Sequence, residues 1–226
     1  MRRKHEVLER SVQIPTSGAI GDLTVPGNAR GIIIFAHGTG SSRLSPRNRY
    51  VASVLQRVKL ATLLLDLLTP EEEQVDVRTR QLRFNIDLLA NRLVEATEWL
   101  RHDETGVGRL QLGYFGASTG AAAALIAAAQ LTDSISAVVS RGGRPDLAGS
   151  ALSKVTAPTL LIVGGDDYAV IDLNEKALKE LRCENRLEIV PGATHLFEQP
   201  GTLEQVAELA SNWFENHLHN ERYMSE

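Results

Sequence analysis

Residues 110–130 read LQLGYFGASTGAAAALIAAAQ. An apolar run ends at Phe115, the motif Gly-x-Ser-x-Gly follows over residues 116–120, and an alanine-rich run comes directly after it. Because small residues permit a tight turn, this order predicts a strand, a sharp turn carrying Ser118, and a helix. The first N–H groups of that helix would favour negative charge developing near the serine. We therefore predict that Ser118 is a nucleophile.

The same alternation of strand and helix extends along the chain. Apolar, β-rich runs predict strands at 31–37, 60–66, 110–116, 135–141, 158–164 and 186–191, with two further strands near 5–15 and 19–25. Helical spacing follows Ser45-Pro46 and recurs over 82–100, and Thr202-x-x-Gln205 predicts a capping box at the start of the last helix. Such alternation is typical of an α/β fold with a mostly parallel sheet and helices on both faces.

Composition and charge restrict the class of protein. The 226 residues are 43% hydrophobic and 23% charged, which suits a single α/β domain over residues 1–226. A net charge of −4 gives no support for binding to nucleic acid. A lone Cys183 excludes an internal disulfide, and no apolar run approaches the ~18 residues of a membrane helix. Without a secretory signal at the N-terminus, we expect a cytoplasmic protein that binds neither nucleic acid nor membrane.

A serine nucleophile needs a base, and the carboxyl edge of the sheet offers two histidines. His37 ends the strand at 31–37, and His195 follows the last strand in a loop before the terminal helix. The loop position of His195 favours it as the general base. The glycine-rich segment 37–42 would supply one backbone N–H of an oxyanion hole from Thr39, and Thr119 would supply the other. His37 is then expected to brace this loop.

The acid that orients the histidine should follow the strand at 158–164. Asp166, Asp167 and Asp172 all lie there. Glu175 stands three residues after Asp172, which predicts that Asp172 caps a helix. Asp166 and Asp167 remain alternatives on this reasoning, and either gives the chain order serine, aspartate, histidine.

These residues resemble the α/β-hydrolase fold and most closely its dienelactone hydrolase-like branch. The resemblance rests on the segments 37–42, 116–120, 164–170 and 191–195 and covers nearly the whole chain. The family's Gly-x-x-Asp-x-x-Val pattern matches Gly164, Asp167 and Val170, which favours Asp167 as the acid. The resemblance also implies an eight-stranded sheet with an antiparallel second strand and no metal or organic cofactor.

The sequence departs from the family pattern at the nucleophile, since dienelactone hydrolases use a cysteine where this chain has Ser118. Cys183 falls outside the expected site, so we expect a serine esterase or a related acyl hydrolase rather than an enzyme for dienelactone. Serine members of the branch also resemble small esterase modules fused to phosphoribosyltransferases. The stretch between Asp66 and Leu82 is polar, which predicts no large cap domain.

Arginines in the predicted edge loops suggest a substrate with an anionic group. Arg43 follows the first buried strand of the predicted parallel sheet, and Arg141 and Arg144 follow the strand at 135–141. Guanidinium groups suit carboxylate or phosphate, although surface pairing with the chain's own acids is the alternative. The sequence thus predicts a serine hydrolase for a small ester or lactone, possible alternatives being an acyltransferase, a peptidase or a non-catalytic binding module.

Overall fold

The computed structural model describes residues 7–102 and 106–218 of the chain. Its eight strands form one sheet in the order β1-β2-β4-β3-β5-β6-β7-β8. The strands are β1 (Leu8–Gln13), β2 (Ile20–Val25), β3 (Gly31–Ala36), β4 (Leu60–Leu65), β5 (Gln111–Ala117), β6 (Ile135–Arg141), β7 (Thr159–Gly164) and β8 (Asn185–Val190). All six predicted runs and the two preceding strands are confirmed within the described residues; positions 5 and 6 of the first lie outside them.

The sheet is parallel from β4 through to β8, and only β2 runs against its neighbours. β2 pairs antiparallel with β1 and with β4, whereas β3 pairs parallel with both β4 and β5. The antiparallel second strand that the resemblance implied is therefore present. Because β3 to β8 share one direction, their carboxyl ends lie along one edge, where α/β proteins place their sites.

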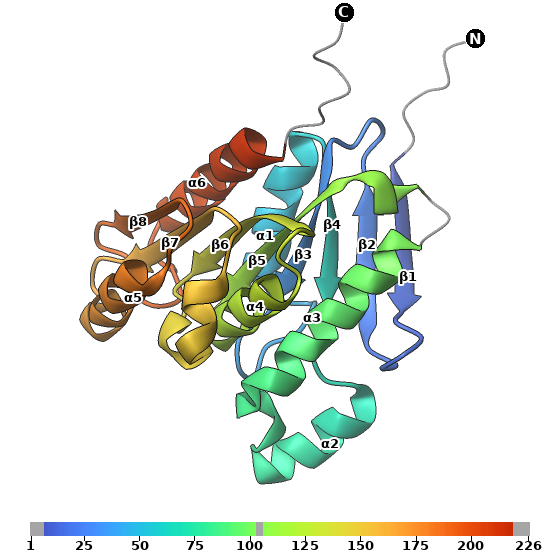
Figure 1. Ribbon diagram of the computed structural model, residues 1–226, viewed down its shortest axis with the longest axis horizontal. Helices are drawn as coiled ribbons and strands as arrows, with labels where there is room; N and C mark the ends of the chain where they lie inside the picture. Colours follow the sequence, from blue (N-terminus) through green and yellow to red (C-terminus); the bar gives the residue numbers. More distant parts are fainter. Residues whose placement is uncertain (1–6, 103–105, 219–226) are drawn as a thin grey trace, which may run out of the picture.

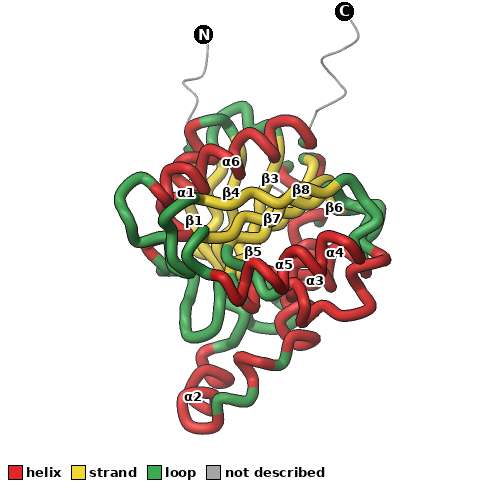
Figure 2. The backbone as a smooth tube through the Cα atoms, turned by 90° about the vertical axis from the view of Figure 1, so that its left-hand side faces the viewer, coloured by secondary structure: helices red, strands yellow, loops and turns green. Residues whose placement is uncertain are grey.

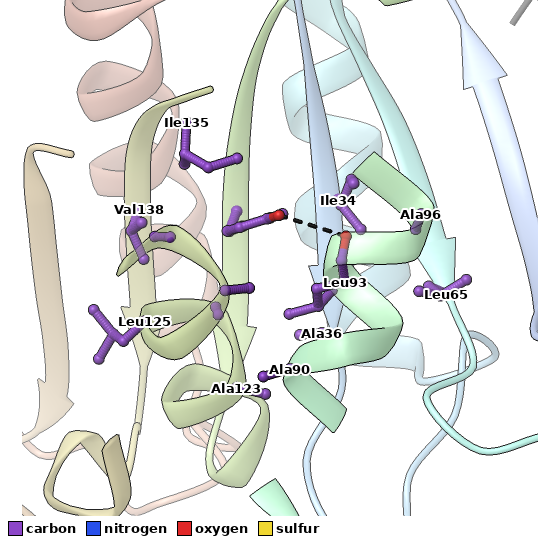
Figure 3. Close-up of a cluster of buried hydrophobic side chains, with 14 of the residues drawn as sticks. Ile34, Ala36, Leu65, Ala90, Leu93, Ala96, Ala123, Leu125, Ile135 and Val138 are labelled. Atoms are coloured by element: carbon purple, nitrogen blue, oxygen red, sulfur yellow. Dashed lines mark hydrogen bonds between the residues drawn. The ribbon is translucent and has the colours of Figure 1, made fainter. Parts of the chain in front are cut away.

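Helices cover both faces of the sheet (Figure 1). One face carries α1 (Pro46–Arg57) and α6 (Thr202–His217), and the other carries α3 (Ile86–Arg101), α4 (Thr119–Gln130) and α5 (Tyr168–Glu180). Short 3₁₀ segments lie at Leu82–Phe84, Val107–Arg109 and Pro145–Lys154. Figure 3 shows Ala90, Leu93 and Ala96 of α3 against Ile34, Ala36 and Leu65 of the sheet.

The alanine-rich α4 is buried along almost its whole length. Residues 119–128 are all buried, and the helix packs between α3 and β5. Small side chains allow this close approach, since interiors pack to the density of organic crystals. The tight packing fixes the start of α4, and with it the turn that carries Ser118.

Three local predictions were wrong or incomplete. α5 begins at Tyr168 with Asp167 at its N-cap position, so Asp172 lies inside the helix. α6 begins at Thr202 after Gly201 in a left-handed conformation, and no side-chain cap forms there. The polar stretch after β4 contains a helix, α2 (Pro70–Thr79), which projects from the carboxyl edge of the sheet (Figure 2). Among residues 7–102 and 106–218, no large cap domain covers that edge.

Candidate active site

Ser118 occupies a strained turn between β5 and α4. Its φ of 50° and ψ of −121° lie in a region that non-glycine residues rarely adopt. Glycine is required on both sides of it. A Cβ on Gly116 would stand 2.4 Å from the Cα of Ala121, and one on Gly120 would stand 2.3 Å from the Ala36 carbonyl oxygen. The two glycines therefore allow the strand and helix to approach closely enough to force the turn.

The backbone of Ser118 is fixed to the end of β6. Its N–H donates to the Arg141 carbonyl at 3.3 Å, and its own carbonyl accepts from the N–H of Arg144 at 3.1 Å and of Ala121 at 3.1 Å. The turn thus depends on β6 as well as on β5 and α4. Strain at such a position persists only where the surroundings hold it.

His195 and Asp167 meet at the same edge. His195 Nδ1 lies 2.7 Å from Asp167 Oδ2, with the histidine side chain 38% exposed and the carboxylate 16% exposed. Asp167 is reached through a turn after β7, in which its N–H donates to the Gly164 carbonyl at 3.0 Å. The side chain of Asp166 is exposed, so of the two alternatives Asp167 contacts the histidine.

Gly142 connects the histidine to the serine turn. It follows Arg141, has a φ of +52°, and a Cβ built on it would lie 3.1 Å from the His195 carbonyl oxygen and 3.6 Å from its Cε1. His195 and Ser118 therefore both lie against the last residues of β6. The fold therefore brings the loop that carries His195 and the turn that carries Ser118 to the same edge of the sheet.

The loop after β3 rests on the serine turn. A Cβ on Gly38 would stand 3.0 Å from Ser118 Cβ, and the hydroxyls of Thr39 and Thr119 are 2.9 Å apart. Thr119 is the first residue of α4, where N–H groups lack partners within the helix. The two residues predicted as oxyanion donors are thus neighbours beside Ser118.

His37 braces the base of this loop. Its Nε2 accepts from the N–H of Leu67 at 3.0 Å, so Nδ1 carries the proton and donates to the Gly38 carbonyl at 2.9 Å. Burial lowers the pKa of His37. The Gly38 carbonyl and the nearby carboxylates of Asp66 and Glu73 raise it by less, so the net shift is downward. A partly buried imidazole with both nitrogens engaged suits the structural role expected of it.

Two of the three predicted substrate arginines bind carboxylates of the chain itself. Arg43 pairs with Asp66 and lies 3.5 Å from Asp22. Arg144 pairs with Asp146 through two hydrogen bonds of 2.8 and 2.7 Å. Arg141 differs, because its side chain is buried and contacts Asn48 rather than an acid.

A cavity of about 590 Å³ opens beside the loop after β3. Its walls come from that loop, from the segment after β4 and from the start of α2, and include Gly40, Ser45, Leu68 and Glu73. This volume is in the range of small-molecule sites, which measure roughly 300–1,000 Å³. Within the described part of the chain, no group of three or more His, Cys, Asp or Glu side chains could hold a metal ion.

The remaining histidines and the cysteine lie elsewhere. His102 caps the end of α3, and His217 Nδ1 lies 2.8 Å from the Trp213 carbonyl oxygen in α6. His5 and His219 fall outside the described residues. Cys183 is half-buried between α5 and β8, and burial raises the pKa of its thiol. Sequence reasoning missed Gln199, whose amide oxygen accepts from the Thr194 N–H at 3.1 Å and so shapes the histidine loop.

Comparison with known proteins places the chain in a family. Residues 60–219 match the model of the dienelactone hydrolase family. This chain belongs to that family. It is 58% identical to a dienelactone hydrolase from Anabaena variabilis ATCC 29413, whose crystal structure superimposes with a TM-score of 0.91 over 96% of this chain and 100% of that one. The family and fold support a hydrolase.

Two curated proteins and a further solved structure are also similar to this chain. Two curated proteins of Mycobacterium tuberculosis, each named a putative phosphoribosyl transferase, are 56% identical over 96% of this chain. The chain covers only 47% of their length. A Xanthomonas campestris protein described as an α/β serine hydrolase without lid shares the fold, with a TM-score of 0.73, 18% identity, and 94% and 95% of the two chains covered.

Proposed function

We propose that this protein is a serine hydrolase that cleaves a small carboxylic ester or lactone through an acyl-enzyme intermediate. The contact that carries the proposal is the 2.7 Å pair of His195 Nδ1 and Asp167 Oδ2, at the same edge of the sheet as a serine on a strained turn. A carboxylate at this distance orients the imidazole and stabilises its cationic form. Membership in a hydrolase family supports the reaction class.

The roles follow from these positions. His195 Nε2 takes the proton of Ser118 Oγ as that oxygen attacks the substrate carbonyl, and the resulting oxyanion accepts from the N–H groups of Thr39 and Thr119. The tetrahedral intermediate collapses, the alcohol leaves with the proton from His195, and the acyl group remains on Ser118. Water activated by His195 then attacks the acyl-enzyme and releases the acid.

The 590 Å³ cavity suits one end of a small substrate. It begins at the oxyanion loop through Gly40 and Ser41 and runs toward the segment after β4. Arg43 and Arg144 already bind Asp66 and Asp146, so among the three predicted arginines only Arg141 is left without a carboxylate of the chain to bind. Carboxylated and neutral esters of one alcohol should therefore both be assayed.

The names of the mycobacterial relatives do not transfer directly to this chain. They describe a transferase, but the chain spans about half the length of those proteins. We propose that the matched half is the hydrolase and that phosphoribosyl transfer belongs to the remainder. An acyltransferase or peptidase would use the same three side chains, so the acceptor must be found by assay.

Fluorophosphonate labelling tests the proposal without a known substrate. The wild type should gain one adduct by intact mass, and Ser118→Ala should gain none and lose ester hydrolysis by ~10⁴-fold or more. Ser153→Ala is the matched control, because Ser153 is exposed on another segment and its hydroxyl donates only to the Ser150 carbonyl. An unlabelled, folded wild type would instead favour a non-catalytic binding module.

A further inference from the structure

Arg141 is a buried cation without an acidic partner in the part of the chain that the structure describes. Its side chain is 5% exposed at the end of β6. Nη2 donates to Asn48 Oδ1 at 3.2 Å, and Nε is buried with no hydrogen-bond partner. Burial, and then the charge of Arg47, lower the pKa of Arg141 to about 10. Arginine is rarely buried unpaired, so this position calls for a compensating role.

The guanidinium lies against the histidine loop. Arg141 Cζ is 5.8 Å from the ring centre of Phe197, which stands two residues after His195. Phe197 is 2% exposed and has a φ of +54°, an unfavourable value for an aromatic residue. Its N–H donates to the Thr194 carbonyl at 3.1 Å, which closes a turn around His195. A cation on the ring face helps to hold this strained turn.

The main chain of the same residue holds the nucleophile. The Arg141 carbonyl accepts from the Ser118 N–H at 3.3 Å. Arg141 is therefore attached to the serine turn through its backbone and to the histidine loop through its side chain. A second contact at the rim supports the same arrangement, since Arg47 of α1 lies 3.6 Å from Glu198 of the loop.

We propose that Arg141 is a positioning residue that sets the histidine loop against the Ser118 turn by packing its guanidinium on Phe197. The proposal rests on the proposed function, because it concerns the alignment of His195 with Ser118. Near-complete burial and packing on an aromatic ring favour this role over a direct contact with an anionic substrate. Arg141 acts on the reaction only through the loop.

Arg141→Met tests the proposal, since it keeps an unbranched apolar stem and removes the charged guanidinium group. With kcat expressed per fluorophosphonate-labelled serine, we expect kcat to fall by up to about 10²-fold, as for a small misplacement of reacting groups, with little change in KM. The loss should be equal for neutral and carboxylated esters. Arg141→Lys should recover part of kcat, because an ammonium group also interacts with the ring.

Arg57→Met is the matched control. Arg57 is exposed at the C-terminal end of α1, whereas Asn48, the residue that Arg141 contacts, lies at the start of that helix. The double variant Arg141→Met/Phe197→Leu shows whether the two residues affect kcat through the same contact or independently. If Arg141 acts through Phe197, the double variant should lose no more activity than the worse single variant.

Three results would overturn the inference: an unchanged kcat per labelled serine in Arg141→Met, additive losses in the double variant, or a loss confined to carboxylated esters. The last would identify Arg141 as an anion-binding residue. A wild type that takes no label would contradict the proposed function itself, so the two failures are distinguishable.

Discussion

His37 is held in one protonation state by two hydrogen bonds of opposite sense. Leu67 donates to Nε2, and Nδ1 donates to the Gly38 carbonyl. A second proton on Nε2 would break the first bond and place a charge in a partly buried site. Burial therefore keeps the pKa of His37 below its usual 6.5. One residue thus couples protonation to the loop that carries Thr39.

This coupling predicts how stability depends on pH. Near and below about pH 6.5 the unfolded chain binds a proton that folded His37 does not, so the free energy of unfolding falls as pH falls toward the folded pKa. His37→Gln keeps an acceptor for the Leu67 N–H and cannot titrate. Relative to the wild type, it should flatten the dependence by up to about 1.4 kcal/mol per pH unit, measured by urea unfolding.

His102→Gln serves as the control for that measurement. His102 is exposed after α3, so its replacement should leave the curve parallel to that of the wild type. If the His37→Gln curve were also parallel, His37 would not carry the coupling.

At the scale of elements, capping residues in the sequence predict a helix that the spacing of apolar residues does not. Thr69 accepts from the Glu72 N–H at 3.2 Å and Glu72 accepts from the Thr69 N–H at 2.8 Å, a capping box followed by Pro70. The same kind of signal at Ser45-Pro46 correctly predicted α1. α2 was missed because it buries almost no apolar surface. The pair Asp172 and Glu175 wrongly predicted a helix start, because two acidic residues three positions apart also occur inside a helix, as they do here in α5.

The site residues divide in a similar way. Ser118, His195 and an acid at position 166 or 167 could be proposed from sequence because each follows a strand, and parallel strands end at one edge. The choice of Asp167 over Asp166 came from the family pattern that the sequence resembles. Pairing of Arg43 with Asp22 and Asp66 could not be proposed from sequence, because these residues meet only through the antiparallel β2 and the end of β4. The packing of Arg141 on Phe197 also depends on tertiary structure alone.

Asp76 attaches the projecting α2 to the segment that follows it. Its Oδ1 accepts from the N–H of Leu82 at 2.8 Å and of Arg83 at 3.1 Å, and its Oδ2 pairs with the Arg83 guanidinium. Burial raises the pKa of Asp76, but the two N–H groups and the guanidinium together lower it by more. The net shift of the pKa is therefore downward. Its stabilising effect is therefore present above about pH 4 and is lost as pH falls below that value.

Asp76→Ala should loosen this segment without unfolding the core. It removes the acceptor for two N–H groups, and we expect trypsin to cut after Arg78 and Arg80 on the order of 10-fold faster at neutral pH. The thermal midpoint of the whole protein should change little, because α2 contributes little to the core. Gln74→Ala, at an exposed position of the same helix, should leave the cleavage rate unchanged; equal rates in the two variants would contradict the assignment.

For the molecule as a whole, the described ends of the chain lie opposite the candidate site. β1 runs parallel to β4, so it begins at the amino edge of the sheet, and Leu218 after α6 packs at Gly31, where β3 begins. Figure 1 shows both ends at the top and α2 at the bottom. No helix of the described residues is long and apolar enough to cross a membrane. This separation matters because the mycobacterial relatives are about twice as long as the matched segment.

A folded domain fused before Val7 or after Leu218 should therefore leave the site accessible. We expect kcat/KM on a small ester and the rate of fluorophosphonate labelling to stay within about 2-fold of the unfused chain, since attachment at a chain end far from a site is tolerated. The same domain inserted after Arg80, in the turn that ends α2, should slow both, because α2 projects from the carboxyl edge of the sheet, where the candidate site lies. The unfused chain mixed with the separate domain controls for simple crowding. Slow labelling in the terminal fusions would mean that an attached domain reaches the carboxyl edge, and the site would then have to be understood as part of a larger interface.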